Sequence, residues 1–362
     1  MSGGPREGRG AAGPRGAAPR PEGAPARQAS PAILLTGVGK RYDIVSCFAR
    51  LTPTIAVDPN PLAPARYAGT LAASAPPIAD PEYVPALIRL CERHRVGAVL
   101  PLTDLDIEVL AIAREQGLLP ALVPSSKVAR ATFDKYEAHL LLSSLSLPSP
   151  PTLLPHQDLQ GLRYPVMVKP RRGSGARSIH LAANEDQARF FIDYVKEPTM
   201  VQTAMLGPEL SIDCLGDLDG RCLNAIPRTM IESRGGESIK GTVVADEDLV
   251  DLGRRVMEAL AVRGPATIQV FRDDQLGLQI TDVNTRFGGA FPGPAYAAKA
   301  GFTYPELIVR LAAGERVQPH VGEFVPGTTF TRYFWQLELD QQLTPTGRDI
   351  VPGGPPPPRC NN

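Results

Sequence analysis

Short apolar segments of strand length alternate with segments of helical periodicity between residues 32 and 102, and this alternation constrains the fold more than any other feature. The strand-like segments are residues 32–37, 54–58 and 98–102, and the helix-like segments are residues 42–51 and 83–94. Strands that alternate with helices form parallel sheets, because each helix returns the chain to the end of the sheet at which the previous strand began. We therefore predict a parallel sheet with covering helices.

Gly37-x-Gly39 follows the first of these strands, and Asp58 ends the second, which imitates a dinucleotide-binding fingerprint. In that fingerprint the acidic residue binds a ribose hydroxyl, and a third glycine lets the helix pack closely on the strand. Tyr42 stands where the third glycine would be. Dinucleotide binding is therefore kept only as the lesser alternative.

A later apolar strand, residues 278–283, runs into a set of polar residues spaced two apart: Asp282, Asn284 and Arg286. Alternate residues of an extended chain share one face, so these three side chains point at the same place. Carboxylate and amide oxygens suit Mg²⁺, and a guanidinium fork suits phosphate or carboxylate. The pattern indicates a metal-phosphate site. Taken alone, it also fits three solvated residues on an edge strand.

Residues 166–169 form another apolar strand, which ends at Lys169 and is followed by a loop that contains Gly173 and Gly175. Glycines let backbone N–H groups approach phosphate oxygens, and the lysine adds a positive charge. The loop is not a Walker A motif, because there the lysine follows the glycines. The segment predicts a nucleotide triphosphate site, with a plain hairpin as the alternative.

The rest of the chain is predicted to form an α+β arrangement. We expect helices over residues 125–144, 185–195 and 247–260, a strand over 200–202, and a hairpin between 210 and 226 that turns at Asp219-Gly220. A second hairpin, between residues 266 and 283, should bring Gln269 beside Asp282 and Asn284.

Five motifs occur in a fixed order along this chain: Lys135, Lys169, residues 201–209, Gln269, and Asp282-x-Asn284-x-Arg286. In that order they resemble the nucleotide and metal motifs of the ATP-grasp superfamily, above all its carbamoyl-phosphate-synthase-like branch, which includes carboxylate-amine ligases. The resemblance covers residues 32–325. It implies an α/β and α+β protein, with a Rossmann-like N-terminal (pre-ATP-grasp) domain followed by a two-lobed ATP-grasp domain.

The resemblance also implies a role for individual residues. Lys135, Lys169, Ser174 and Gly175 would contact the ATP phosphates, Gln202, Thr203 and Met205 would belong to the hinge that reads adenine, and Glu209 would bind the ribose. Gln269, Asp282 and Asn284 would hold Mg²⁺, with Mn²⁺ as an alternative. Arg286 would steady the transferring phosphoryl group, and Arg228 would join it in clamping a substrate carboxylate.

Three positions depart from the family pattern. Asp282 stands where the family commonly has glutamate, and Thr285 replaces a proline. Thr203 stands at a hinge position that often carries glutamate. Residues 233–240, which the resemblance places near the phosphates and the acceptor, also fit a glycine-rich surface loop, and Arg228 also fits a simple ion pair.

The resemblance implies an ATP-dependent ligase in which a carboxylate becomes an acyl phosphate and an amine then displaces phosphate. The alternatives are a phosphotransferase or carbamoyl-phosphate-type synthase, and a nucleotide sensor without catalysis. The expected substrates are a small carboxylate such as an amino acid and an amine, and a homodimer is left open.

Composition agrees with a globular enzyme. The 38 basic and 38 acidic side chains balance, so we expect neither nucleic acid nor a membrane as partner. Five scattered cysteines without paired spacing predict reduced thiols and a cytoplasmic location. We predict a disordered Gly/Ala/Pro/Arg tail over residues 1–30, the Rossmann-like domain over 31–123, the ATP-grasp domain over 124–330, and an extension with a proline-rich tail over 331–362.

Overall fold

The computed structural model describes residues 30–173, 178–235, 237–289, 291, 293–333 and 335–347. The N-terminal tail predicted over residues 1–30 falls outside these ranges except for its last residue. The proline-rich segment 351–360, Ser174 and Gly175 also lie outside the described residues. The predicted domain boundaries at residues 123 and 330 stay predictions.

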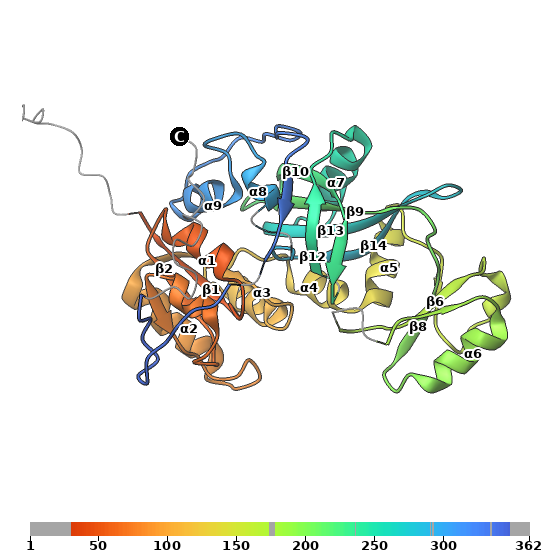
Figure 1. Cartoon of the computed structure of the whole chain (residues 1–362), viewed down its shortest axis with the longest axis horizontal. Helices are drawn as coiled ribbons and strands as arrows, with labels where there is room; N and C mark the ends of the chain where they lie inside the picture. The colour runs from red at the N-terminus through yellow and green to blue at the C-terminus, as the bar shows by residue number, and fades with distance from the viewer. Residues whose placement is uncertain are drawn as a thin grey trace, which may run out of the picture. The chain divides into compact units, whose positions relative to one another are not determined.

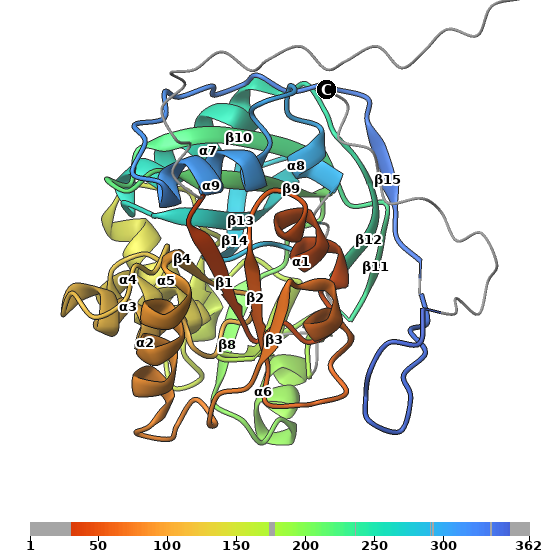
Figure 2. The same cartoon turned by 90° about the vertical axis from the view of Figure 1, so that its left-hand side faces the viewer.

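The first sheet is parallel and has the strand order β3-β2-β1-β4. Its strands are β1 (Ala32–Thr36), β2 (Thr54–Val57), β3 (Leu71–Ala73) and β4 (Val96–Pro101). Every residue of β1 and β2 is buried, as expected for parallel strands that are covered on both faces. The helices α1 (Tyr42–Ala49), α2 (Tyr83–His94) and α3 (Ile107–Glu115) accompany the sheet (Figure 2). The predicted strand-helix alternation is confirmed.

Asp58 closes the turn that follows β1 and does not point to open solvent. Its carboxylate accepts hydrogen bonds from the backbone N–H of Gly39 at 2.8 Å and of Asn60 at 2.9 Å, and the residue is 8% exposed. Gly39 has a φ of 47°, which favours glycine. Asp58, the acid of the apparent dinucleotide fingerprint, is therefore already hydrogen-bonded to backbone groups of the protein.

The single helix predicted over residues 125–144 is wrong, because two helices occupy this segment. They are α4 (Ser126–Phe133) and α5 (Lys135–Ser144), separated by Asp134 in an extended conformation. The Asp134 side chain accepts hydrogen bonds from the backbone N–H groups of Tyr136 and Glu137 and so caps α5. An N-cap residue has non-helical backbone angles, so α4 ends before Asp134 and α5 begins after it.

A small antiparallel sheet has the order β5-β8-β6-β7. It consists of β5 (Thr152–Leu153), β6 (Val166–Pro170), β7 (His180–Ala182) and β8 (Thr199–Thr203). Helix α6 (Glu185–Tyr194) packs on β6 and β7, as Figure 1 shows. The α+β lobe predicted around these strands is confirmed.

The larger antiparallel sheet has the order β10-β9-β13-β14. Its strands are β9 (Glu209–Gly216), β10 (Cys222–Thr229), β13 (Gly264–Asp273) and β14 (Gly277–Asn284). Helix α7 (Glu247–Ala259) packs on β9 and β10, whereas α4 and α5 pack on β14 (Figure 1). The predicted hairpin turn at Asp219-Gly220 joins β9 to β10, with Gly220 at a φ of 84°.

A third antiparallel sheet has the order β11-β12-β15. Its strands are β11 (Glu232–Arg234), β12 (Glu237–Thr242) and β15 (Thr329–Thr331), which lie side by side in Figure 2. The sequence also fitted a glycine-rich surface loop over residues 233–240. The structure instead pairs β11 with β12 in this segment. Two helices, α8 (Gly293–Tyr296) and α9 (Tyr304–Ala312), precede β15.

One apolar core connects the first sheet with the larger antiparallel sheet. It contains Ile33 and Phe48 from the N-terminal part, Leu215 from β9, and Phe287 and Tyr304 further along the chain. Because these side chains are buried together, the loops that follow β4 and β14 are held next to one another. Among the described helices, none is long and apolar enough to cross a membrane.

Candidate nucleotide and phosphoryl-transfer site

Lys169 is a buried cation at the end of β6. It is 9% exposed, and its Nζ donates to Oε1 of Gln202 on β8 at 2.8 Å. The amide of Gln202 in turn donates to the Thr152 hydroxyl at 2.8 Å. Burial lowers the pKa of Lys169 to about 8, an effect that Asp282 opposes and Lys135 reinforces. Two predicted phosphate contacts and a predicted metal ligand therefore share one electrostatic neighbourhood.

Lys135 reaches the same place from the first turn of α5. Its Nζ donates to the carbonyl of Gly173, in the loop after β6, at 2.8 Å. Asp134 holds the start of that loop through Arg171, whose guanidinium lies 2.9 Å from the Asp134 carboxylate. Sequence reasoning missed Asp134, although its position before a helix is a usual N-cap signal. One residue thus breaks the helix, orients Lys135 and anchors the glycine loop.

The hairpin β13–β14 aligns the three predicted metal ligands. Gln269 lies directly opposite Asp282, and Thr267 lies opposite Asn284. Glu209, predicted at the ribose, joins this group because its carboxylate accepts a hydrogen bond from the Gln269 amide at 3.1 Å. Burial raises the pKa of Glu209, Arg228 lowers it, and the nearby Asp282 carboxylate raises it further.

A cavity of about 190 Å³ opens beside these residues. Lys135 and Gly173 form part of its wall, and Asp282, Asn284 and Thr285 from the end of β14 form another part. The loop after β4 also lines it, with Thr103, Asp104 and Leu105. The cavity therefore brings Lys135, two of the three metal candidates and a loop of the first sheet into contact with the same space, whereas Lys169 and Gln269 do not line it.

Arg286 spans from the end of β14 to that loop. Its Nη2 lies 2.9 Å from the Asp104 carboxylate and 3.2 Å from Oδ1 of Asn284. Its Nη1 donates to the carbonyl of Phe287 at 3.0 Å. Asp104 was not predicted, because nothing in its local sequence indicates a partner 182 residues away.

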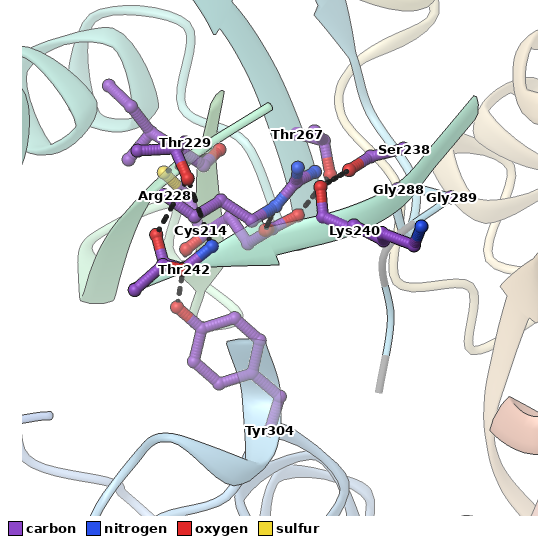
Figure 3. A network of polar contacts seen from close by, with 12 residues as sticks. Cys214, Arg228, Thr229, Ser238, Lys240, Thr242, Thr267, Gly288, Gly289 and Tyr304 are labelled. Atoms are coloured by element: carbon purple, nitrogen blue, oxygen red, sulfur yellow. Dashed lines mark hydrogen bonds and ion pairs between the residues drawn. The ribbon is translucent and has the colours of Figure 1, made fainter. Parts of the chain in front are cut away.

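Arg228 belongs to a buried polar network that Figure 3 shows from close by. Its Nε donates to Oδ2 of Asp213 at 2.6 Å, and the Thr267 hydroxyl donates to Oδ1 of the same carboxylate at 2.7 Å. The Tyr304 hydroxyl donates to the Asp213 carbonyl at 2.7 Å. Arg228 is 1% exposed, and its Nη1 has no hydrogen-bond partner among the described residues. The predicted ion pair exists, and it leaves one buried donor available.

Gly288 closes over this network. A Cβ at this position would lie 2.4 Å from the Thr267 hydroxyl and 3.1 Å from Oδ1 of Asp213. The chain therefore needs glycine here for close approach rather than for an unusual backbone angle. Asp213 and Thr267 were missed by sequence reasoning, since neither belongs to a motif with a recognisable spacing.

The predicted adenine hinge forms the end of β8. The backbone N–H groups of Thr203 and Ala204 donate to the carbonyls of Pro151 and Pro165, both at 2.9 Å. The Thr203 hydroxyl is buried and has no hydrogen-bond partner in the described ranges. Met205, the last predicted hinge residue, is half-buried.

The residues at the end of the β13–β14 hairpin fit a Mg²⁺ ion by their chemistry. Asp282 and Glu209 supply carboxylates, and Asn284 and Gln269 supply amide oxygens, which are the ligands that this hard cation prefers. Besides burial, the Asp282 carboxylate raises the pKa of Glu209, so the two carboxyl groups repel each other. A cation between them would relieve that repulsion. Among the described residues, no group of three or more His, Cys, Asp or Glu side chains could hold a metal ion, here or elsewhere, so this site depends on amide oxygens as well as carboxylates.

Comparison with known families agrees with this arrangement. Residues 195–332 match the family described as "ATP-grasp in the biosynthetic pathway with Ter operon". Residues 33–118 match the family described as "PylC-like, N-terminal domain". The chain therefore carries a PylC-like N-terminal domain followed by an ATP-grasp domain. These matches confirm the predicted superfamily resemblance and the fold class.

Similar proteins include several curated ligases and synthases. The carbamoyl phosphate synthase large chain of Agathobacter rectalis is 29% identical over 171 residues, which are 43% of this chain and 15% of that protein. VanA of Enterococcus faecium is 25% identical over 41% of this chain and 50% of its own length. D-alanine–D-alanine ligase of Petrotoga mobilis is 23% identical over 54% of this chain and 74% of its own length. The match thus spans half or less of the first two relatives.

Solved structures share the fold at low sequence identity. The biotin carboxylase domain of Hydrogenobacter thermophilus 2-oxoglutarate carboxylase, a dimer in complex with MgADP, ADP and bicarbonate, has a TM-score of 0.65 at 18% identity, over 84% of this chain and 74% of that one. The L-amino acid ligase of Bacillus licheniformis has a TM-score of 0.62 at 18% identity, over 83% and 79%. At this identity the likeness shows the fold alone.

Proposed function

We propose that this chain is an ATP-dependent carboxylate-amine ligase that forms an amide through an acyl phosphate and releases ADP. One observation carries the proposal. The phosphate-binding candidates Lys135 and Gly173 line the same cavity as Asp282 and Asn284. Lys169 shares the electrostatic neighbourhood of Lys135 and Asp282. Such a combination of cations and oxygen ligands suits a triphosphate whose terminal group is to be transferred.

Each residue has a defined task in this reaction. Lys135 and Lys169 bind the outer phosphates of ATP, and the glycine loop after β6 covers them. Gln269, Asp282 and Asn284 would hold Mg²⁺, which when bound would offset the negative charge of the phosphates. Glu209, predicted at the ribose, is proposed here as a further metal ligand instead, because its carboxylate contacts the Gln269 amide. Arg286 aligns the γ-phosphate with the attacking carboxylate, and the free Nη1 of Arg228 takes a substrate oxygen. No side-chain nucleophile is required.

The expected substrates are a small carboxylate, such as an amino acid, and an amine. Support comes from the names of the similar proteins, which include D-alanine–D-alanine ligases and an L-amino acid ligase. Mg²⁺ with ADP is bound in the biotin carboxylase domain that shares the fold. The proposal also includes Mn²⁺ as a replacement metal, a homodimer and a cytoplasmic location.

The test measures ADP release and acyl phosphate formation together. The purified chain is incubated with Mg-ATP, hydroxylamine and a panel of amino acids and other small acids. Hydroxylamine traps an acyl phosphate as a hydroxamate, in proportion to ADP. Asp282→Asn should lower the hydroxamate at least ~100-fold if metal positioning supplies about 3 kcal/mol of barrier lowering. Asp274→Asn, a change of a residue in the exposed β13–β14 turn, is the matched control.

Two results would overturn the proposal in different directions. ADP release without hydroxamate, over the whole panel, would favour a phosphotransferase. Tight Mg-ATP binding without ADP release for any acid would favour a nucleotide sensor.

A further inference from the structure

Three arginines converge on three consecutive backbone carbonyls after β14. Arg286 donates to the carbonyl of Phe287 at 3.0 Å, Arg41 donates to that of Gly288 at 2.7 Å, and Arg332 donates to that of Gly289. The three residues come from distant parts of the chain: Arg41 precedes α1, Arg286 follows β14, and Arg332 follows β15. Their convergence is therefore a product of the tertiary fold.

Two of the cations around this segment have a close acidic partner. Arg286 lies 2.9 Å from the Asp104 carboxylate, and Lys40 lies 2.9 Å from the Glu237 carboxylate. Arg286 donates a hydrogen bond to Asp104, whereas Lys40 and Glu237 form an exposed ion pair. Asp104 and Glu237, two of the described carboxylates near the segment, are thus each paired with a cation.

Arg41 and Arg332 make only long contacts to carboxylates. The nearest carboxylate to both is Asp43, at 3.9 Å from Arg41 and 3.7 Å from Arg332, and Arg332 lies 3.8 Å from Glu237. Because Glu237 is already paired with Lys40, two guanidinium groups face one unpaired carboxylate. One positive charge is therefore left unbalanced.

Arg41 is also buried with an unsatisfied donor. The residue is 7% exposed, and neither its Nε nor Oδ1 of Asp43 has a hydrogen-bond partner among the described residues. Burial lowers the pKa of Arg41 to about 10, so the guanidinium stays charged at neutral pH. Nε of Arg41 and Oδ1 of Asp43 face each other at 3.9 Å, as an ion pair too long for a hydrogen bond, and a buried charged donor without a hydrogen bond is costly unless a ligand satisfies it.

We propose that Arg41 and Arg332 bind the carboxylate of the acceptor amine, which makes the acceptor an amino acid or a related amino carboxylate. This inference rests on the proposed ligase function. A carboxylate carries the single negative charge that the pair lacks, and a guanidinium fork matches its two oxygens.

The position of the pair favours the acceptor over the donor acid. Arg41 is close enough to Arg286 for the two charges to affect each other, and both contact the same three-residue segment. The donor carboxylate must react at Arg286 with the γ-phosphate. A second carboxylate site next to it suits a molecule whose amine attacks there, because the amine and the carboxylate of an α-amino acid are one carbon apart.

Hydroxylamine separates this inference from the proposed function, because it is an acceptor amine without a carboxylate. The donor acid found with hydroxylamine is presented with the proteinogenic L-amino acids and, in parallel, with their α-amides. Amide product is measured by mass spectrometry and ADP by a coupled assay. The wild type should prefer amino acids to their amides by about 10- to 100-fold in kcat/KM, as expected for a charge-assisted contact.

Arg332→Gln is the main variant, because its side chain is 24% exposed and so tolerates change better than that of Arg41. It should lower kcat/KM for the amino acid acceptor by about 10- to 100-fold and remove the preference over the α-amide, while hydroxamate formation changes far less. Arg41→Gln should show the same pattern. Arg234→Gln, at an exposed arginine of the neighbouring strand β11, is the matched control and should change neither reaction.

Each other outcome would overturn the inference. An equal loss of hydroxamate and amide in both variants would assign the pair to the donor acid or to the fold, and a raised KM for the donor would identify the former. An unchanged preference for the amino acid in both variants would remove the pair from substrate binding. Absence of hydroxamate in the wild type would instead refute the proposed ligase function.

Discussion

The first sheet and the larger antiparallel sheet bury different kinds of residue, although both have four strands. Strands β1 and β2 bury aliphatic side chains and threonines on both faces. Strands β9, β10 and β13 bury aliphatic side chains against α7, but also Asp213, Arg228 and Thr267. A sheet that exists only to support the fold has no need of buried charge, because burial of a charge costs free energy unless it is paired. We therefore expect the antiparallel sheet, rather than the first sheet, to carry the residues of the proposed reaction.

The strongest test of this comparison is to break the buried ion pair. Arg228→Met leaves the Asp213 carboxylate buried with only the Thr267 hydroxyl as side-chain partner, and should lower the free energy of unfolding by about 3–5 kcal/mol. The double variant Arg228→Met/Asp213→Leu should regain most of the stability, because no charge is left buried, but should stay inactive. Urea unfolding measures both. A single variant that costs under about 1 kcal/mol would mean that the pair is solvated.

The first sheet should respond differently. Leu35 is fully buried in β1, and Leu35→Ala should lower the free energy of unfolding by about 2–4 kcal/mol through loss of packing. The activity per folded molecule should not change, because Leu35 contributes only to the scaffold. Circular dichroism in urea, together with ADP release at a fixed folded fraction, checks this. A loss of kcat in the folded protein would show that the first sheet also acts in catalysis.

Lys169, at the end of β6, should bind the outer phosphates of ATP. Lys169→Ala should weaken ATP binding by about 10- to 100-fold and AMP binding much less, since a charged contact to phosphate is lost. Calorimetry with both nucleotides provides the measurement, and Lys127→Ala, at an exposed lysine of α4, is the control. Equal losses for ATP and AMP would place Lys169 away from the outer phosphates.

The pKa of the same lysine predicts opposite pH trends for stability and activity. Burial lowers this pKa to about 8 from 10.5, so between these values the unfolded chain binds more protons than the folded chain. The free energy of unfolding should therefore rise with pH over this window, by up to about 3 kcal/mol, and kcat/KM for ATP should fall as pH increases through about 8. In Lys169→Arg, which stays protonated, both trends should be absent. A flat activity profile in the wild type would contradict the low pKa.

The smallest effect is expected from the N-terminal segment. Deletion of residues 1–30 should leave the unfolding transition and the affinity for ATP nearly unchanged, because this stretch has almost no large apolar side chain to pack. Gel filtration and nucleotide titration of the truncated chain test this. Loss of soluble protein would show that the segment contributes to the fold.

Local residue patterns were sufficient to predict much of the scaffold and part of the site. The apolar runs predicted the strands of the parallel sheet, and the turn at residues 273–277 predicted the hairpin that sets Gln269 opposite Asp282. Lys169 was placed correctly at the end of a strand. These features depend on residues close together in the sequence, so periodicity and turn chemistry are enough to reveal them.

The partners of the charged residues were decided only by the tertiary structure. Arg286 meets Asp104 across 182 residues, and Arg41 meets Gly288 across 247. Asp134 breaks a helix that propensity alone would continue, because it also holds Arg171 at the start of the glycine loop. A single charged or polar residue shows no periodicity, and its partner is set by which loops the shared core brings together. The sequence by itself therefore determined the strands and the hairpin, whereas packing between distant segments determined how the arginines and carboxylates pair.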